Sequence, residues 1–386
     1  FKEAIQRARK GKGPSVIISN VVRLLAHSSS DDQRKYRDEK SLSADLKKDP
    51  IKILESKCLD AGFLDNDGFG KIKAQIEAQV DSDAKWAESQ QYPEPSTALD
   101  YIYSGGNIPE GQDYKTISDK IVLVDAINHA LHEEMSLNDK MVVYGQDIAD
   151  PKGGVFTATK GLSEKFGNNR VFNSPLAESS IVGTAIGMSV AGYKPVVEIQ
   201  FGDYIWTAMM QIRNELATMR YRSNNAWSCP IVIRVPVGGY IHGALCHSQS
   251  IDGYFMHLPG IYIAYPSCAA DAKGLLKMAC RMNDPVIFME HKGLYRQNYA
   301  ATQEPDEEYI LPFGKGRIVN EGDELTLITW GAMVQKSLDA IRSLALSDGI
   351  IEVIDLRTLN PVDLHLIKTS IIKTNKVLIV HEDNIT

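Results

Sequence analysis

One glutamate stands where the chain could do acid–base chemistry. Glu178 lies in the run Phe172-Asn-Ser-Pro-Leu-Ala-Glu-Ser-Ser-Ile-Val-Gly, just before a helix-like stretch whose glycines allow another backbone to approach closely. A carboxylate at that point is placed to be buried, and burial is one way in which proteins tune a carboxyl group for proton transfer. The alternative is that Glu178 caps the helix through the amides of its first turn.

Two histidines lie in a Gly-rich polar stretch that follows a buried-looking strand ending at Pro236. Loops after strand ends are where open α/β sheets hold their ligands. His242 and His247 are five residues apart, but no third ligand has the spacing of a zinc site. Proton transfer or hydrogen bonding by His247 is therefore favoured over metal binding, and we assign no metal ligand.

Two further residues have both a functional and an ordinary interpretation. His27 lies beside Arg23 in a loop rich in serine and aspartate, where a solvated histidine is the alternative to a catalytic one. Tyr204 belongs to Glu198-Ile-Gln-Phe-Gly-Asp-Tyr-Ile-Trp, an aromatic and polar cluster that interrupts an apolar strand. Such a cluster could hold a flat ring or could pack in a core.

The elements that must position these residues alternate between helix and strand. Near-continuous apolar strands separated by helices indicate a mainly parallel sheet covered on both faces, which is an α/β fold. We expect helices over 121–135, 181–191, 204–217 and 269–282, and strands over 141–144, 195–200, 231–236, 261–265 and 286–289. A loop over 303–313 precedes a second alternation, with a helix over 332–344 and strands over 325–330, 350–355 and 377–381.

The first hundred residues have a different pattern. We expect helices over 1–10, 41–48, 50–61 and 70–88, and a β-type run over 14–22. Proline, glycine, serine and asparagine then fill the stretch between Gln91 and Asp119, which is linker composition. The sequence lacks the GxGxxG, GxxxxGK[ST] and GxSxG motifs of dinucleotide sites, P-loops and hydrolase elbows.

Composition narrows the class of protein further. The 386 residues are 44% hydrophobic and carry a formal charge of -7, which argues against a nucleic-acid partner. The five cysteines form no CxxC pair, as is usual in a reducing compartment, and we expect a cytoplasmic protein. The sequence contains no run of eighteen apolar residues, so we expect no membrane partner. Because the chain begins at Phe1 and ends after a strand-like run, we expect a fragment.

Two separate parts of the chain resemble the two subunits of one enzyme family. Four runs resemble the β subunit of 2-oxo acid dehydrogenases, most closely the branched-chain type. They are the two runs quoted above that begin at Phe172 and Glu198, together with His242-Gly-Ala-Leu-Cys-His-Ser-Gln-Ser and Val353-Ile-Asp-Leu-Arg-Thr-Leu-Asn-Pro. Arg23-Leu-Leu-Ala-His-Ser-Ser-Ser-Asp-Asp, followed by Tyr36-Arg37 and Lys48-Asp-Pro, resembles the C-terminal part of the α subunit. The resemblance covers nearly the whole chain and implies a natural α–β fusion of the kind found in bacteria.

The resemblance implies a thiamine-diphosphate-binding, transketolase-like fold. The expected parts are an α-subunit-like helical tail over 1–90, a linker over 91–118, a parallel-sheet pyrimidine-binding domain over 119–302 and a truncated transketolase C-terminal-like domain over 313–386. The implied activity is oxidative decarboxylation of a 2-oxo acid, most closely 3-methyl-2-oxobutanoate, with transfer of the acyl group to a lipoyl group.

Residue roles follow from the same resemblance. Glu178 matches the glutamate that hydrogen-bonds the aminopyrimidine ring of thiamine diphosphate, and His247 matches the histidine that helps to pass the acyl group to the lipoyl arm. Tyr204 and Phe201 would lie beside the cofactor. His27 matches a catalytic loop histidine near the diphosphate.

The remaining assignments concern substrate, metal ions and partners. His242 and Gln200 are assigned to the substrate pocket. Magnesium would be held by residues outside this chain, and no residue is assigned to the potassium ion that relatives hold with carbonyls near Ile231 and Ala279. The implied partners are a lipoylated acyltransferase component and further copies in an α2β2-like assembly.

Several alternatives stay open at this point. The substrate could be pyruvate or acetoin, the enzyme could be a transketolase-like synthase, or the chain could be a non-catalytic assembly subunit. In animal relatives the position of Ser28 carries a regulatory phosphate, which would add like charge beside Asp31 and Asp32. Whether Ser28 is phosphorylated is likewise open.

Overall fold

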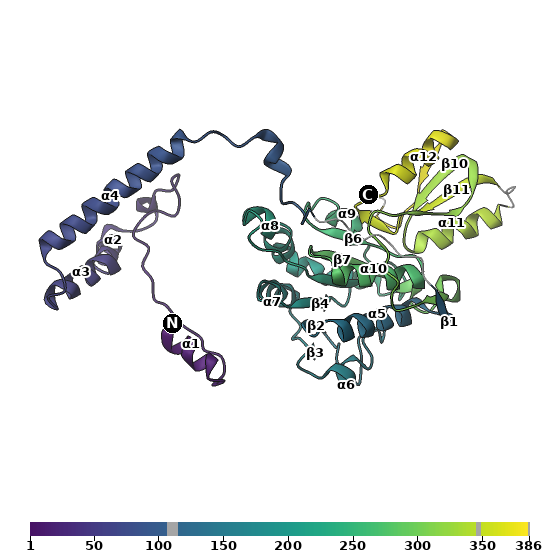
Figure 1. Cartoon of the computed structure of the whole chain (residues 1–386), viewed down its shortest axis with the longest axis horizontal. Helices are drawn as coiled ribbons and strands as arrows, with labels where there is room; N and C mark the ends of the chain where they lie inside the picture. Colours follow the sequence, from purple (N-terminus) through teal and green to yellow (C-terminus); the bar gives the residue numbers. More distant parts are fainter. Residues whose placement is uncertain (106–114, 345–348, 385–386) are drawn as a thin grey trace. The chain divides into compact units, whose positions relative to one another are not determined.

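The protein is described by a computed structural model that covers residues 1–105, 115–344 and 349–384. It divides into two compact units, Phe1–Glu94 and Pro95–Thr386 (Figure 1).

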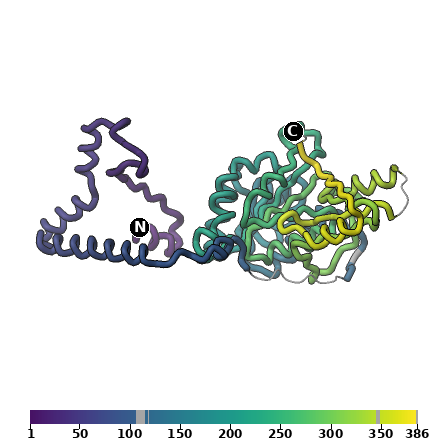
Figure 2. Tube along the Cα trace, turned by 90° about the horizontal axis from the view of Figure 1, so that it is seen from above, coloured from purple at the N-terminus to yellow at the C-terminus, as the bar shows by residue number. Residues whose placement is uncertain are grey.

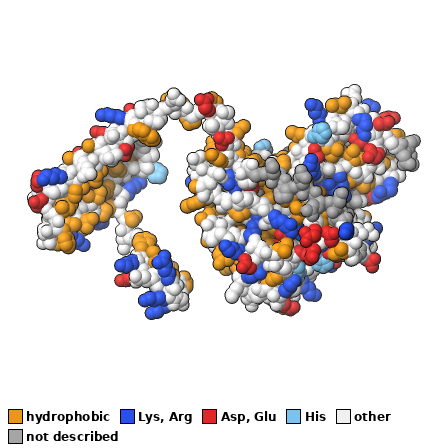
Figure 3. Space-filling view, in the orientation of Figure 1, with side chains coloured by type: hydrophobic (Ala, Val, Ile, Leu, Met, Phe, Trp, Pro, Cys, Tyr) orange, Lys and Arg blue, Asp and Glu red, His pale blue; other side chains and the backbone are white. Residues whose placement is uncertain are grey.

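The unit Phe1–Glu94 is helical. Its α-helices are α1 (Lys2–Arg9), α2 (Glu39–Leu46), α3 (Pro50–Asp60) and α4 (Asn66–Ser89), with a short 3-10 helix over Gln33–Lys35. Aspartates start three of these helices, because Asp38, Asp49 and Asp65 each accept a hydrogen bond from a first-turn amide. No residue of this unit is buried, and apolar side chains such as Ile72, Ile76 and Val80 of α4 are exposed. Figure 3 shows hydrophobic side chains, in orange, on the surface of the helices of this unit.

The β-type run expected over 14–22 is wrong. These residues form no strand, and Val16, Ile18 and Val21 are each at least 85% exposed. A strand needs a neighbour to pair its backbone groups, and the unit Phe1–Glu94 has no strand. Local β propensity alone therefore does not form a strand here.

The second unit is built on a seven-stranded sheet with the order β12-β6-β7-β5-β4-β2-β3. Figure 1 labels most of these strands, and Figure 2 traces the backbone of the same unit from above. All neighbours are parallel except β12 and β6. The strands are β2 (Met141–Gly145), β3 (Val171–Asn173), β4 (Lys194–Glu198), β5 (Val232–Val237), β6 (Tyr262–Ala264), β7 (Val286–His291) and β12 (Thr358–Asn360). This parallel sheet, with helices on both faces, is the fold class expected from the sequence.

Each face of the sheet has its own hydrophobic core. Alternate residues of β2 separate into the two cores, with Val143 on one side and Val142 on the other. The helices α5 (Leu123–Leu137) and α10 (Ala269–Arg281) contribute to the first core, and α7 (Glu178–Val190) contributes to the second. Shorter helices are α6 (Leu162–Phe166), α8 (Met219–Arg222) and α9 (Asp252–Phe255).

A smaller α/β layer follows in the same unit. Its sheet has the order β13-β10-β11-β9, formed by β9 (Arg317–Asn320), β10 (Gly322–Thr329), β11 (Gly349–Asp355) and β13 (Val377–Ile379). The helices of this layer are α11 (Ala332–Ser343) and α12 (Leu364–Thr374). β1 (Thr116–Ile121) and β8 (Thr302–Pro305) form a separate antiparallel pair.

Three expected elements differ from the structure. The single helix expected over 204–217 is a 3-10 helix, η3 (Gly202–Ala208), followed by a π-helical stretch, η4 (Gln211–Leu216). The expected linker over 91–118 overlaps the start of β1, and its residues 106–114 lie outside the described residues. Part of the loop expected over 303–313 pairs as β8, since β1 supplies a neighbouring strand.

No described helix is both long and apolar enough to cross a membrane. The cytoplasmic location expected from the cysteine pattern stays a prediction.

Candidate functional site

Three polar residues and one glycine follow the carboxyl ends of β2, β4, β5 and β7 at one edge of the main sheet. Gln146 follows β2, Gln200 follows β4, Gly238 follows β5 and Lys292 follows β7. In parallel sheets this edge is where ligands bind.

Glu178 begins α7 and is 7% exposed. Its Oε1 atom accepts a hydrogen bond from Gln146 Nε2 at 3.1 Å, and its Oε2 atom accepts one from Thr207 Oγ1 at 2.9 Å. Both oxygens are thus oriented by side chains from other elements. This arrangement is that of a held carboxylate, whereas a helix cap would bond the first-turn amides.

The rings of Phe201, Tyr204 and His247 contact one another. Tyr204 Oη lies 3.2 Å from His247 Nε2. The ring of Phe201 makes edge-to-face contacts with the rings of Tyr204 and His247, and the centroids of the Phe201 and His247 rings are 4.5 Å apart. Burial raises the pKa of the Tyr204 phenol. The direction of its hydrogen bond with His247 is set by the tautomer of the imidazole. Thr207 donates to Glu178 from the same 3-10 helix as Tyr204, so both parts of the site share η3.

The two residues assigned to the substrate pocket have different surroundings. Gln200 Nε2 donates to Gln146 O at 3.3 Å and to Asp147 Oδ2 at 3.0 Å, so its amide braces the turn after β2. His242 is exposed and has a left-handed backbone conformation, with φ of 54°. Both assignments to the substrate pocket stay predictions.

His27 belongs to the unit Phe1–Glu94, where an ordered loop surrounds it. The backbone amide of His27 donates to Asp31 Oδ2 at 2.9 Å, and Tyr36 Oη donates to the same oxygen at 2.6 Å. Arg23 in turn donates to Tyr36 Oη at 3.0 Å. The imidazole and Ser28 are exposed, and the catalytic role of His27 stays a prediction.

Lys292, which was not singled out in the sequence, lies near the ring of Phe201. Lys292 is 1% exposed, its Nζ atom lies 5.7 Å from the centroid of the Phe201 ring, and the atom has no hydrogen-bond partner within the described part of the chain. Burial lowers the pKa of Lys292 to about 8, although the charges of Asp203 and Glu382 oppose the shift. A lysine directly after a buried strand was the available signal.

We expect Lys292→Met to change the stability of the protein in a pH-dependent way. Because the pKa of Lys292 is about 8 when folded and near 10.4 when unfolded, the unfolded state binds more protons between these values. Burial of the charged ammonium thus costs stability at pH 7, and this cost disappears as the pH rises toward 10. The variant should gain about 2 kcal/mol more relative to wild type at pH 7 than at pH 10.

Urea denaturation of wild type and variant at both pH values measures this difference. Lys315→Met is the matched control, because Lys315 is exposed. An equal effect of Lys292→Met at both pH values would contradict the prediction.

Another buried ammonium lies near Ala279. Lys194 Nζ donates to the carbonyl oxygens of Ala279 and Met282, at 2.9 Å each, so that these carbonyls at the end of α10 are satisfied by a side chain. Among the described residues, no group of three His, Cys, Asp or Glu side chains could hold a metal ion.

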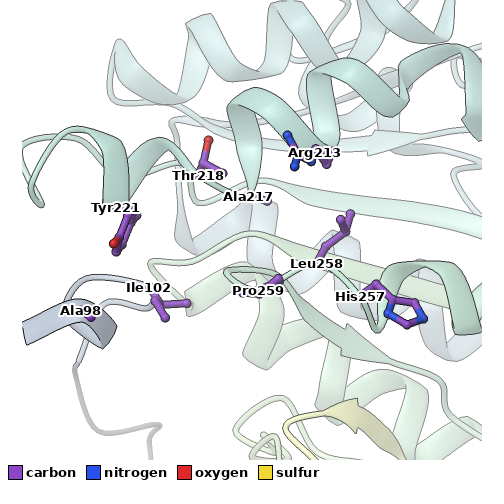
Figure 4. Close-up of a pocket in the computed structure, with 9 residues that line it drawn as sticks. All are labelled: Ala98, Ile102, Arg213, Ala217, Thr218, Tyr221, His257, Leu258 and Pro259. Carbon is purple, nitrogen blue, oxygen red and sulfur yellow. The ribbon is translucent and has the colours of Figure 1, made fainter. Parts of the chain in front are cut away.

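A cavity of about 390 Å³ opens elsewhere in the second unit. Figure 4 shows Arg213, Tyr221 and His257 among the residues that line it. Glu178, Tyr204 and His247 do not contribute to its lining. The candidate site is therefore identified by its polar geometry at the strand ends and not by this cavity.

The sequence matches three family descriptions. Residues 1–96 match "Dehydrogenase E1 component", residues 119–298 match "Transketolase, pyrimidine binding domain" and residues 314–386 match "Transketolase, C-terminal domain". These matches agree with the resemblance noted in the sequence and with the α/β fold.

Curated relatives are similar over about two thirds of the chain. The 2-oxoisovalerate dehydrogenase subunit beta of Bacillus subtilis (strain 168) is 50% identical over 261 residues, which are 67% of this chain and 79% of that protein. The pyruvate dehydrogenase E1 component subunit beta of the same organism is 43% identical over 264 residues, covering 68% and 80%. A solved structure titled "Split gene transketolase, inactive beta4 tetramer" has a TM-score of 0.54 at 24% identity, covers 68% of this chain and 79% of its own, and supports the fold alone.

Proposed function

The chain belongs to the E1 components of the 2-oxo acid dehydrogenases, and from this premise we propose that it acts on branched-chain 2-oxo acids. The enzyme is an oxidoreductase. The observation that carries the choice of substrate is the 50% identity to a 2-oxoisovalerate dehydrogenase subunit, against 43% to a pyruvate dehydrogenase subunit. The proposed product is an acyl group transferred to the lipoyl group of an acyltransferase partner.

The donor set at Glu178 fits thiamine diphosphate. A buried carboxylate that already accepts two hydrogen bonds retains lone pairs for a third, which an aminopyrimidine ring can supply. Tyr204 lies in the same 3-10 helix as Thr207, and its ring contacts that of Phe201, so these residues offer aromatic surface for a flat ring. When bound, the cofactor supplies the carbon nucleophile and the electron sink for decarboxylation.

The residues of this chain would then act in distinct roles. Glu178 holds and moves a proton at its carboxylate oxygens. His247, held by Tyr204, donates a proton to the sulfur of the incoming lipoyl arm. His27 is proposed to contact the diphosphate, and His242 and Gln200 to border the substrate. Magnesium would be held by residues outside this chain.

The domain boundaries and the assembly are part of the proposal. We place the E1-like tail at 1–90, the pyrimidine-binding domain at 119–302 and the C-terminal-like domain at 313–386, which the family matches over 1–96, 119–298 and 314–386 support. We further propose an α2β2-like assembly that docks to a lipoylated acyltransferase.

Turnover of two substrates by the full-length protein tests the proposed function. With thiamine diphosphate, magnesium and an artificial electron acceptor, kcat/KM for 3-methyl-2-oxobutanoate should exceed that for pyruvate by about 10-fold or more, since a few buried methyl groups contribute about 1–3 kcal/mol. A preference for pyruvate would reassign the substrate. Cofactor binding without turnover of either acid would indicate a transketolase-like synthase, and no cofactor binding would indicate an assembly subunit.

A further inference from the structure

We propose that Gln146 and Thr207 are positioning residues, which fix the Glu178 carboxylate by one neutral donor on each oxygen. The inference rests on the proposed function of Glu178 and deepens it. Neither Gln146 nor Thr207 was singled out in the sequence. Both side chains would orient the Glu178 carboxylate, which exchanges the proton.

The two donors come from different elements, and each donates to a different oxygen of Glu178. Gln146 is 6% exposed and donates to Oε1 from the turn after β2, whereas Thr207 donates to Oε2 from η3. The Thr207 hydroxyl also lies 3.1 Å from Tyr204 O, but Glu178 Oε2, at 2.9 Å, is the closer acceptor for its single proton. With one donor on each oxygen, rotation of the carboxylate is restricted.

A second set of contacts holds Gln146 itself. Gln200 Nε2 donates to Gln146 O and to Asp147 Oδ2, and Lys152 Nζ donates to the same Asp147 oxygen at 2.6 Å. Asp147 adopts a left-handed backbone, with φ of 59°, which is strained for a residue other than glycine and needs such support. These contacts fix the backbone from which the Gln146 amide reaches Glu178.

The Gln146 amide suits this position because it is an uncharged hydrogen-bond donor. An amide donor stabilises the ionised carboxylate, whereas a second carboxylate at the same position would repel it, and the two would share a proton. Gln146→Glu changes almost no volume but replaces the donor by an acid about 3 Å from Glu178. The double variant Gln146→Glu with Glu178→Gln restores one amide and one acid with their places exchanged.

Stability without cofactor provides the first readout. In urea denaturation of the full-length protein, Gln146→Glu should raise the unfolding equilibrium constant at pH 8 at least tenfold, with a much smaller effect at pH 5, where a proton is shared. The exchanged double variant should return to within about threefold of wild type. Gln303→Glu, on an exposed glutamine of β8, is the control.

Kinetics provide the second readout. In the exchanged double variant kcat should stay at least 100-fold below wild type, because the carboxylate stands in the wrong place. Thr207→Val should lower kcat about tenfold with little change in KM, and Thr207→Ser, which keeps the hydroxyl, should stay within about threefold of wild type.

Either readout can overturn the inference. If Gln146→Glu behaves like Gln303→Glu at both pH values, the contact with Glu178 is not made. If Thr207→Ser loses as much activity as Thr207→Val, the hydroxyl does not position the carboxylate. The stability readout needs no turnover. An inactive wild-type protein would refute the proposed function, while urea denaturation would still decide whether Gln146 contacts Glu178.

Discussion

Replacement of Glu178 by glutamine should lower kcat for the preferred 2-oxo acid by about 10³-fold or more, a loss of roughly 4 kcal/mol of transition-state stabilisation. The substitution preserves volume but removes the charge and the site of proton exchange. It also turns an acceptor of two hydrogen bonds into a group with only one oxygen, although Gln146 and Thr207 both approach as donors. Steady-state turnover with an artificial electron acceptor measures the effect.

A charge-matched control separates catalysis from folding. Glu215→Gln removes a carboxylate whose side chain is 49% exposed and pairs with Arg222, and it should leave kcat within about twofold. Calorimetric titration should find thiamine diphosphate binding by Glu178→Gln, so that the loss lies in turnover. If Glu178→Gln retains more than a tenth of wild-type kcat, Glu178 does not exchange the proton.

Replacement of Arg234 by methionine should destabilise the protein by about 3–5 kcal/mol, the range for breaking a buried ion pair on one side. Arg234 is 1% exposed on β5 and donates to Glu198 at 2.8 Å and to Glu290 in a bidentate pair at 2.7 and 2.8 Å. Tyr295 Oη also donates to Glu290, at 2.6 Å. Without the guanidinium, two buried carboxylates face each other without a cation.

The loss should depend on pH. Burial raises the pKa of Glu198 even in the presence of Arg234, so without the arginine one carboxylate should take up a proton in the folded state. The folded variant then binds more protons than the unfolded chain, and its stability relative to wild type should fall from pH 5 to pH 8. Urea denaturation at both pH values measures this trend.

Arg222→Met is the matched control for the buried arginine. Arg222 is 60% exposed and pairs with Glu215 on the surface, so its loss should cost about 0–1 kcal/mol at either pH. Equal costs for Arg222→Met and Arg234→Met would show that the buried cluster does not stabilise the sheet. Glu198 lies two residues before Gln200. Loss of the ion pair between Arg234 and Glu198 would therefore also affect the end of β4, from which Gln200 braces the site.

The sequence by itself determined most of the elements of the second unit. Apolar runs of strand length separated by helical patterns predicted β2, β4, β5 and β7, because a parallel sheet buried on both faces requires nearly continuous apolar strands. The position of Glu178 before a helix also predicted a buried carboxylate, and its side chain is buried. These features depend on residues that are neighbours in the chain, so periodicity records them.

Only the tertiary structure decided which side chains meet. Gln146 and Thr207 are 32 and 29 residues from Glu178 in the chain, and no local pattern connects them. Lys292 contacts the Phe201 ring only because β7 ends beside the same edge. The run over 14–22 has β propensity but no partner strand, whereas β12 forms because β6 offers a free edge. Pairing and hydrogen bonding across long sequence separations are set by packing, and a single sequence does not encode them as a local pattern.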